Sequence, residues 1–215
     1  MTNNSKQDQE IIVVETRLLF KSNYFQGFKK HTEFDFHELI LNNMKIMKRG
    51  DAEKDNSHKQ PIAYAIIVNK KTNQIFAYQR SVKDEDYKEK RLQGKWSWGV
   101  GGHIEKKDIN DRDTIKKSLL REALKEEVDI IEGRVKNFTI LGYINDDNNE
   151  VGRVHFGVLY LVETDGDVRP KDKEIAQGKF YEIGELENIC SSHDFKVETW
   201  SQIALKPIKE YLDKL

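Results

Sequence analysis

The chain lacks the features of secreted, membrane-bound and nucleic-acid-binding proteins. Of its 215 residues only Cys190 is a cysteine, which excludes an internal disulfide and suits a reducing compartment. Its apolar runs are too short to span a bilayer, and no signal peptide or internal repeat is recognisable. The formal net charge is −1 with both signs interspersed, so no broad basic surface is available for a nucleic acid. We therefore expect a cytoplasmic protein with no membrane or nucleic-acid partner.

The length of the chain allows one well-packed domain with additions, or at most two small domains. Hydrophobic residues make up 37% and charged residues 34%, which is typical of a polar globular protein. Residues 1–10 are polar, and we expect them to form a flexible N-terminus. Residues 11–215 are expected to form a single domain with an N-terminal strand and helix extension and a C-terminal helix. A homodimer is compatible with the sequence, which does not fix the oligomeric state.

The hydrophobic pattern predicts a mixture of strands and helices. We expect strands at residues 11–20, 62–68, 74–80, 138–144, 154–162 and 180–183. Helices are expected at residues 34–48, 114–128, 184–189 and 197–215. The second and third strands form a hairpin around residues 69–73. Such an order predicts an α+β fold in which a mixed sheet lies inside an α/β/α sandwich.

The stretch from Gly99 to Ile130 carries the strongest chemical signal. Asp113 is a plausible N-cap, and at about 100° per residue the apolar side chains after it form one arc. Glu127 falls near the middle of that arc, where a carboxylate is costly unless a cation compensates it. Glu122 and Glu126 lie at its margin, and a hard cation such as Mg²⁺ would relieve the repulsion among the three. The alternative is a solvated charged face paired with Arg121 and Lys125, and periodicity alone does not separate the two.

The same stretch resembles the Nudix box of the MutT-like pyrophosphohydrolases. That pattern reads G, five residues, E, seven residues and then REUxEExGU, where U is a bulky aliphatic residue. Gly102 matches the leading glycine, and Asp108 stands where the family has a glutamate. Glu126 and Glu127 match the acidic pair, and Asp129 replaces the last glycine.

Two registers of the box compete, because the loop after Asp108 is long and Arg121-Glu122 lies one residue too far from the acidic pair. Aligning Glu126 and Glu127 fits better, but it puts Ala123 in the place of the family's first helix glutamate. Aligning Arg121-Glu122 puts Lys125 in a ligand position. One extra residue absorbed as a π-bulge near Ala123 would reconcile the registers. A regular i→i−4 ladder over residues 119–127 would exclude this explanation.

The resemblance extends over most of residues 10–205, towards the branch described as predicted MutT-family phosphoesterases. Besides the box it includes the strand pair IAYAIIV (62–68) and IFAYQRS (75–81) followed by GKWSWGVGGHIE (94–105). It also includes the segments IIVVETRLLF (11–20), KRGDAEKD (48–55) and GYINDDNNEVGRVHFGVLYLV (142–162). It implies a Nudix fold and a metal-dependent pyrophosphohydrolase that uses Mg²⁺ or Mn²⁺. The implied substrate is a nucleoside diphosphate linked to another moiety, cleaved at a phosphoanhydride bond, although which one is not readable from the sequence.

The resemblance also implies the roles of particular residues. The metal would be held by Glu122, Glu126 and Glu127 with a backbone carbonyl of Gly101 or Gly102. Glu122 or Glu174 would be the base, and Arg121 would position the carboxylates or balance their charge. Glu174 precedes Gly178 as a late-loop glutamate does in the family, although it is equally a solvated loop acid.

Four residues are candidates for binding substrate. Arg80 and Arg91 would pair with its phosphates through bidentate hydrogen bonds. His103 would face the substrate, and Trp98 would stack on a base. The ordinary alternatives are surface arginines, a structural histidine and a core tryptophan.

Two other functions remain open at this stage. The irregular box, with Asp108 and Asp129 at altered positions, suits a catalytically weak or inactive sensor or regulator that binds a nucleotide without cleaving it. Diphosphate isomerase chemistry on the same fold is expected to require a cysteine in the site, and Cys190 lies far along the chain.

Overall fold

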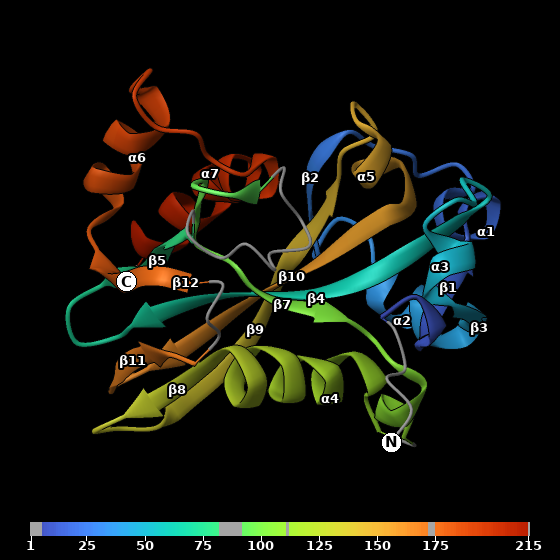
Figure 1. Cartoon of the computed structure of the whole chain (residues 1–215), viewed down its shortest axis with the longest axis horizontal. Helices are drawn as coiled ribbons and strands as arrows, with labels where there is room; N and C mark the ends of the chain where they lie inside the picture. Colours follow the sequence, from blue (N-terminus) through green and yellow to red (C-terminus); the bar gives the residue numbers. More distant parts are fainter. Residues whose placement is uncertain (1–5, 82–91, 111, 172–174, 215) are drawn as a thin grey trace. The chain divides into compact units, whose positions relative to one another are not determined.

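The computed structural model describes residues 6–81, 92–110, 112–171 and 175–214. The chain divides into two compact units, each built from three segments. Unit 1 contains Met1–Tyr64, Gly101–Glu122 and Ile140–Leu159, and unit 2 contains Ala65–Val100, Ala123–Thr139 and Tyr160–Leu215. Three neighbouring strands run through both units (Figure 1): β4 (His58–Asn69), β10 (His155–Thr164) and β9 (Val135–Asn145).

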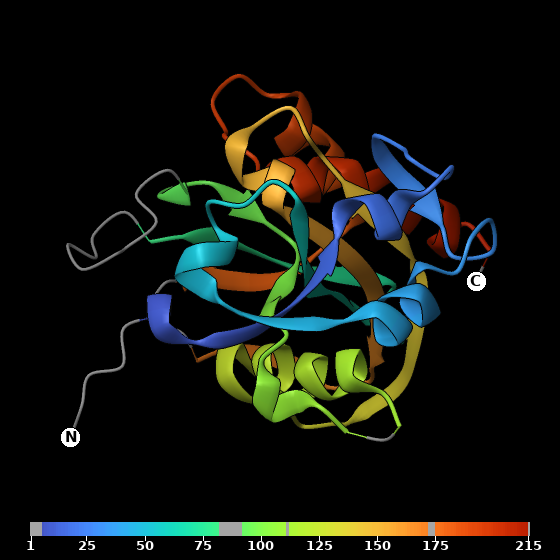
Figure 2. The same cartoon turned by 90° about the vertical axis from the view of Figure 1, so that its right-hand side faces the viewer.

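Unit 1 is organised around strand β1 (Glu10–Glu15). Its other elements are η1 (Lys6–Asp8), α1 (Thr16–Phe20), β2 (Gly27–Lys30), α2 (Phe36–Asn43), β3 (Lys45–Lys48), α3 (Arg49–Ala52), most of β7 (Val100–His103), η3 (Lys106–Asp108), α4 (Thr114–Arg121) and α5 (Glu150–Val154). β1 pairs antiparallel with β3 (Figure 2) and, at Val14 and Glu15, with the start of β4. The backbone N–H of Ile12 also donates to Ile104 O at 2.7 Å. β1 therefore holds both β3 and the chain directly after β7.

Aromatic side chains form much of the interior of unit 1. Phe36 and Phe156 are fully buried with ring centroids 5.3 Å apart, and Tyr143 lies 5.0 Å from Phe36. Phe20 adds an edge-to-face contact with Phe156 at 5.9 Å. These offset contacts suit the quadrupoles of the rings, and they tie α1, α2, β9 and β10 together.

Unit 2 contains the hairpin and most of the C-terminal part of the chain. Its elements are β5 (Gln74–Arg80), β6 (Trp96–Ser97), β8 (Val128–Ile131), β11 (Asp167–Pro170), β12 (Ile175–Tyr181), α6 (Ile183–Ser191) and α7 (Thr199–Leu212). β5 pairs with β12, β6 and the end of β4, all antiparallel. β8 and β11 form a separate two-stranded sheet. The π-helical segment η4 (Glu122–Glu127) begins with the last residue of unit 1 and continues in unit 2.

The predicted hairpin over residues 62–80 is confirmed, as are strands within 138–144 and 154–162. Two predictions are wrong in part. The strand expected over 11–20 ends at Glu15, and residues 16–20 form the helix α1. Successive side chains of a strand point to opposite faces, so a strand covered on one face would not bury both Leu19 and Phe20, as the structure does. The helix expected over 34–48 ends at Asn43, because residues 45–48 pair with β1.

The architecture is a mixed sheet with helices and is of the α+β class, as expected. Among the described helices none combines the length and the apolar character needed to cross a bilayer.

Candidate functional site

Two glycines of β7 bring bare backbone into close contacts in unit 1. Gly101 has φ +134°, and a Cβ there would lie 1.9 Å from the carbonyl oxygen of Ala63. Only glycine tolerates both the angle and the contact. A Cβ on Gly102 would lie 2.9 Å from Oε2 of Glu122. The backbone at Gly102 therefore lies directly against the Glu122 carboxylate.

Arg121, the last residue of α4, connects the residues around this contact. Its Nε donates to Asp108 Oδ1 at 2.8 Å and its Nη2 to Asp108 Oδ2 at 2.6 Å, a bidentate pair. Nη1 donates to Glu122 Oε1 and lies 3.1 Å from Glu105 Oε1. Nη2 also donates to the His103 carbonyl at 3.2 Å. One guanidinium thus orients three carboxylates and the end of β7.

The charges of this group reinforce one another. Burial alone would lower the pKa of Arg121, but hydrogen bonds to Asp108 and Glu122 outweigh burial and raise that pKa. Burial likewise would raise the pKa of Asp108, whereas the hydrogen bonds from Arg121 bring it below its usual value. Asp108 is 1% exposed and the Arg121 side chain 14%, so solvent screens the pair weakly. Arg121 and Asp108 therefore stay charged at neutral pH.

The helix that carries Arg121 starts where its sequence predicts, but its regular part is shorter than the helix expected over residues 114–128. Asp113 is the N-cap, and its carboxylate accepts from the backbone N–H of Lys116 at 2.9 Å. The regular helix ends at Arg121, and residues 122–127 are π-helical. The predicted π-bulge near Ala123 is thus confirmed. Within and directly after this segment Ala123 and Val128 are buried, whereas Glu127 is half-buried and Glu126 is exposed.

The predicted site residues are divided between the two units. Gly101, Gly102, His103, Arg121 and Glu122 lie together in unit 1. Four belong to unit 2: Arg80, Trp98, Glu126 and Glu127. Arg91 and Glu174 fall outside the described residues.

In unit 2 the two predicted substrate-binding residues have intramolecular contacts. Arg80 Nε donates to Glu198 Oε1 at 2.8 Å, and its guanidinium lies over the ring of Tyr78. Trp98 is 1% exposed, and its backbone N–H donates to Ser201 Oγ at 3.1 Å. Stacking of Trp98 on a base would therefore require its ring to become exposed.

His103 belongs to a second cluster of unit 1, with Gln60, His155 and Glu53. Its Nε2 lies 2.9 Å from Gln60 Oε1 and 3.2 Å from His155 Nε2. Oε1 of Glu53 lies 4.0 Å from His103 Nε2 and 3.9 Å from His155 Nε2. Burial, followed by the charges of Arg49, His155 and Lys6, brings the pKa of His103 well below its ordinary value. The ring of His103 is therefore neutral at pH 7.

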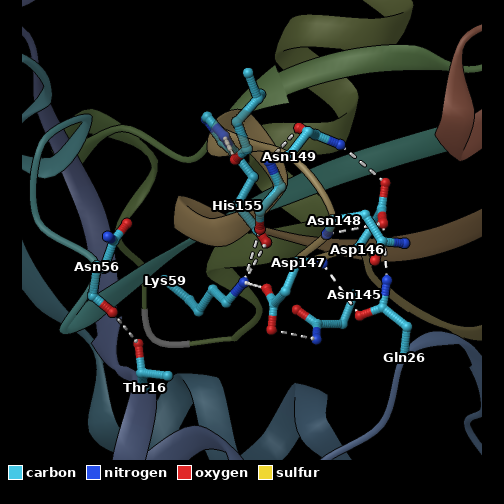
Figure 3. A network of polar contacts seen from close by, with 12 residues as sticks. Thr16, Gln26, Asn56, Lys59, Asn145, Asp146, Asp147, Asn148, Asn149 and His155 are labelled. Atoms are coloured by element: carbon cyan, nitrogen blue, oxygen red, sulfur yellow. Dashed lines mark hydrogen bonds and ion pairs between the residues drawn. The ribbon is translucent and has the colours of Figure 1, made fainter.

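A polar network fixes His155 in this cluster (Figure 3). Its Nδ1 lies 2.7 Å from the carbonyl of Val151, which can only accept, so Nδ1 carries the proton and Nε2 has a lone pair. The backbone carbonyl of His155 accepts from Nζ of the buried Lys59 at 3.3 Å. Lys59 also donates to Asp147 at 2.6 Å and to the Gly152 carbonyl at 2.7 Å.

Sequence reasoning identified only His103 of the second cluster. Glu53 and His155 lie within the resembling segments 48–55 and 142–162, and Gln60 lies outside them, but the resemblance implies no ligand role for any of the three. Near His155 the sequence also predicted the strand over residues 154–162. β1 brings these segments together by pairing with β3, which leads to Glu53, and by bonding Ile104, which follows His103.

The two groups of side chains suit different chemistry. Around Gly102 the available donors are carboxylate and carbonyl oxygens, which suit hard cations such as Mg²⁺. The second cluster offers imidazole nitrogen together with oxygen.

Cys190, in α6, is half-buried, and burial raises the pKa of its thiol, which keeps it protonated.

Comparisons with known proteins agree with one another. The family model described as the NUDIX domain matches residues 58–201, more than half of the chain. Protein YmaB of Bacillus subtilis (strain 168) is 34% identical over 208 residues, covering 93% of this chain and 97% of its own. The crystal structure of Tm1382, a proposed Nudix hydrolase, is similar with a TM-score of 0.76 and 27% identity, covering 96% of this chain and 100% of that one.

A more distant match concerns the fold alone. The NUDIX domain of Shewanella oneidensis NrtR, in complex with ADP ribose, has a TM-score of 0.52 at 13% identity and covers 72% of this chain and 88% of that one. The family match includes the glycines of β7, Arg121 and the π-helical segment, and the similarity to Tm1382 extends over nearly the whole chain. The chain therefore belongs to the Nudix family and has its fold.

Proposed function

We propose that the protein is a metal-dependent hydrolase that cleaves a phosphoanhydride bond in a nucleoside diphosphate linked to another moiety. Its membership of a hydrolase family supports the reaction type. The observation that carries the proposal is the contact between Gly102 and the Glu122 carboxylate. Because residue 102 has no side chain, the carboxylate lies directly against the peptide backbone, so both could bind one metal ion.

The donor atoms of the predicted site fit Mg²⁺ or Mn²⁺. Glu122, Glu126 and Glu127 offer carboxylate oxygens, and Gly101 or Gly102 would offer a carbonyl. A Cβ on residue 102 would meet the Glu122 carboxylate, so glycine leaves that space for a ligand. Such ions would supply charge neutralisation for the diphosphate and a lowered pKa for the attacking water.

The π-helical segment supports the use of all three carboxylates. In a regular helix the directions of Glu122 and Glu127 would differ by about 140°. An i→i+5 turn contains more residues than an α turn, so this angle is smaller in η4. The extra residue therefore favours a shared role for Glu122 and the Glu126-Glu127 pair, as the family pattern requires.

The chain's own residues would position the carboxylates and accept a proton. Arg121, held by Asp108, fixes one oxygen of Glu122 and leaves the other beside Gly102. Glu122 or Glu174 would then act as general base towards the attacking water. Arg80 and Arg91 would bind substrate phosphates, and for Arg80 this requires exchange of its bond to Glu198.

The test is hydrolysis of a substrate panel with Mg²⁺ and with Mn²⁺. The panel contains nucleoside diphosphate sugars including ADP-ribose, dinucleoside polyphosphates, nicotinamide dinucleotides and nucleoside triphosphates. ADP-ribose is included because the NrtR domain was crystallised with it. We expect Glu126→Gln to lower turnover by orders of magnitude with an unchanged melting temperature. Glu132→Gln, at an exposed position of the same unit, is the matched control and should retain full activity.

The same panel of compounds, used in calorimetry, distinguishes a hydrolase from a nucleotide-binding sensor. Ala123 in the place of a family glutamate, under one register of the box, favours the sensor. Calorimetry that detects binding of a panel compound without release of any product would support the sensor and contradict the hydrolase. We propose that the protein acts in the cytoplasm, which its single cysteine fits.

A further inference from the structure

We propose that unit 1 contains a second metal site, built from Glu53, Gln60, His103 and His155, that binds a divalent transition ion of the zinc type. The four ligand atoms are Oε1 of Glu53, Oε1 of Gln60 and Nε2 of both histidines. Its residues are separate from the carboxylates of the box, so the proposal does not depend on the proposed function.

The distances from His103 Nε2 to Gln60 and His155 suit a tetrahedral ion. Bonds of about 2.0–2.1 Å to zinc place tetrahedral ligands about 3.3 Å apart. His103 Nε2 lies 3.2 Å from His155 Nε2 and 2.9 Å from Gln60 Oε1. The two distances to Glu53, 3.9 and 4.0 Å, exceed this value, but its partly exposed side chain can move. Binding therefore requires the Glu53 side chain to move towards the two histidines.

The protonation pattern of His155 also suits a ligand. Its Nδ1–H donates to the Val151 carbonyl, so its Nε2 lone pair points into the cluster. A metal-ligating histidine usually donates its other N–H to such an acceptor, which fixes the tautomer. Lys59 holds the backbone of the same residue. Gln60 Oε1 can only accept, so His103 Nε2 carries the ring proton in the hydrogen bond between them. For His103 to bind an ion through Nε2, that proton must move to Nδ1, which leaves the ring neutral.

Gln60 provides an independent observation. It is 0% exposed, and no described acceptor lies within hydrogen-bond distance of its Nε2. An unsatisfied buried amide group costs about 1–3 kcal/mol. The Oε1 of the same side chain lies 2.9 Å from His103 Nε2, so Gln60 directs an oxygen into the cluster while its Nε2 stays unsatisfied.

The ligand chemistry selects the class of metal. Imidazole suits zinc, copper, nickel and iron, whereas Mg²⁺ prefers oxygen ligands. Two neutral imidazoles, one amide oxygen and one carboxylate give a donor set with one negative charge. The bound ion would join positions 53, 103 and 155 of the chain, so we assign it a stabilising role in unit 1.

The test is titration of the chelator-treated full chain with Co²⁺, which gives a strong visible absorption when it is tetrahedral, and calorimetry with Zn²⁺ alone. We expect one equivalent to bind with that absorption and to raise the melting temperature. His103→Gln and His155→Gln should each weaken binding at least about tenfold. The matched control is His193→Gln, an exposed histidine of unit 2, which should leave binding unchanged.

Two further variants keep the test decisive if a histidine variant fails to fold. The double variant Glu122→Gln/Glu126→Gln should keep the cobalt absorption, and its loss would show that the ion binds at the box instead. Arg49 Nε lies 3.4 Å from Glu53 Oε1 and competes with a cation there, so Arg49→Gln should tighten binding. Unchanged affinity in Arg49→Gln, or full binding in the histidine variants, would overturn the site.

Discussion

Arg121 and Asp108 form a bidentate pair in which both hydrogen bonds are 2.8 Å or shorter, and Asp108 is almost completely buried. In the sequence, Asp108 stands where the family has a glutamate. In the structure it fixes the arginine that holds Glu122, and it also accepts from the backbone N–H of Glu105 at 2.9 Å. A shorter acid at this position therefore has a clear positioning role.

Replacement of Asp108 by alanine should destabilise the protein strongly. The change leaves Arg121 with less compensation in a mostly buried place, and loss of one partner of such a pair costs about 3–5 kcal/mol. Urea unfolding measures the loss. Asp194→Ala, at an exposed position, should change stability by less than about 0.5 kcal/mol. Equal stabilities of the two variants would contradict the importance of the pair.

Replacement of Arg121 by lysine should separate charge from geometry. Lysine keeps the positive charge but cannot reproduce the bidentate fork to Asp108 together with the bonds to Glu122 and His103 O. If Glu122 acts as proposed, kcat with the best panel substrate should fall at least about tenfold while KM changes little. Lys116→Arg, the reverse exchange at an exposed position of α4, is the control that should keep kcat. Equal kcat values for the two variants would contradict a positioning role for Arg121.

Replacement of Gly101 by alanine should be among the most harmful small changes in the chain. The new Cβ would meet Ala63 O at 1.9 Å, and φ +134° is strained for any L residue. We expect a loss of about 3 kcal/mol or more in the free energy of unfolding. Gly184→Ala is the matched control, because a Cβ there has no neighbour within 4 Å and the residue lies in α6. It should be neutral or slightly stabilising.

Acid should weaken the protein partly through Asp165. The hydrogen bond from Lys136, and then that from the backbone N–H of Arg134, lower the pKa of Asp165 to about 2. Because this pKa lies below the unfolded value of 3.8, the stabilisation is fully present above about pH 4 and is lost as pH falls towards 2. The difference in unfolding free energy between the wild type and Asp165→Asn should shrink over that range. A constant difference from pH 5 to pH 2 would reject the assignment.

Local sequence patterns were sufficient where one motif or one strand pair decides the structure. The hairpin of β4 and β5 was predicted from two apolar runs and a polar turn, and the π-helical segment from a one-residue excess between Arg121-Glu122 and Glu126-Glu127. Such features depend on residues close together in the chain. Periodicity failed at residues 45–48, where pairing with β1 overrides a helical apolar stripe.

The second cluster was not predictable, because its geometry depends on long-range pairing. Glu53 follows a short helix, Gln60 lies within a buried strand and His155 begins another. No spacing in the sequence joins these three residues as ligands of one site. Their meeting requires β1 to bond β3 on one side and Ile104 on another, and no periodicity encodes that arrangement.

The extra residue in η4 has a consequence for how this segment could have evolved. Without Ala123, the sequence from Arg121 would read RELKEEVDI, which has the family's spacing and differs from its pattern only by aspartate for glycine. A chain shortened by that one residue could close the segment as an ordinary α turn. The insertion is therefore of a kind that a helix can gain or lose in a single genetic event while the acidic residues on either side keep their order.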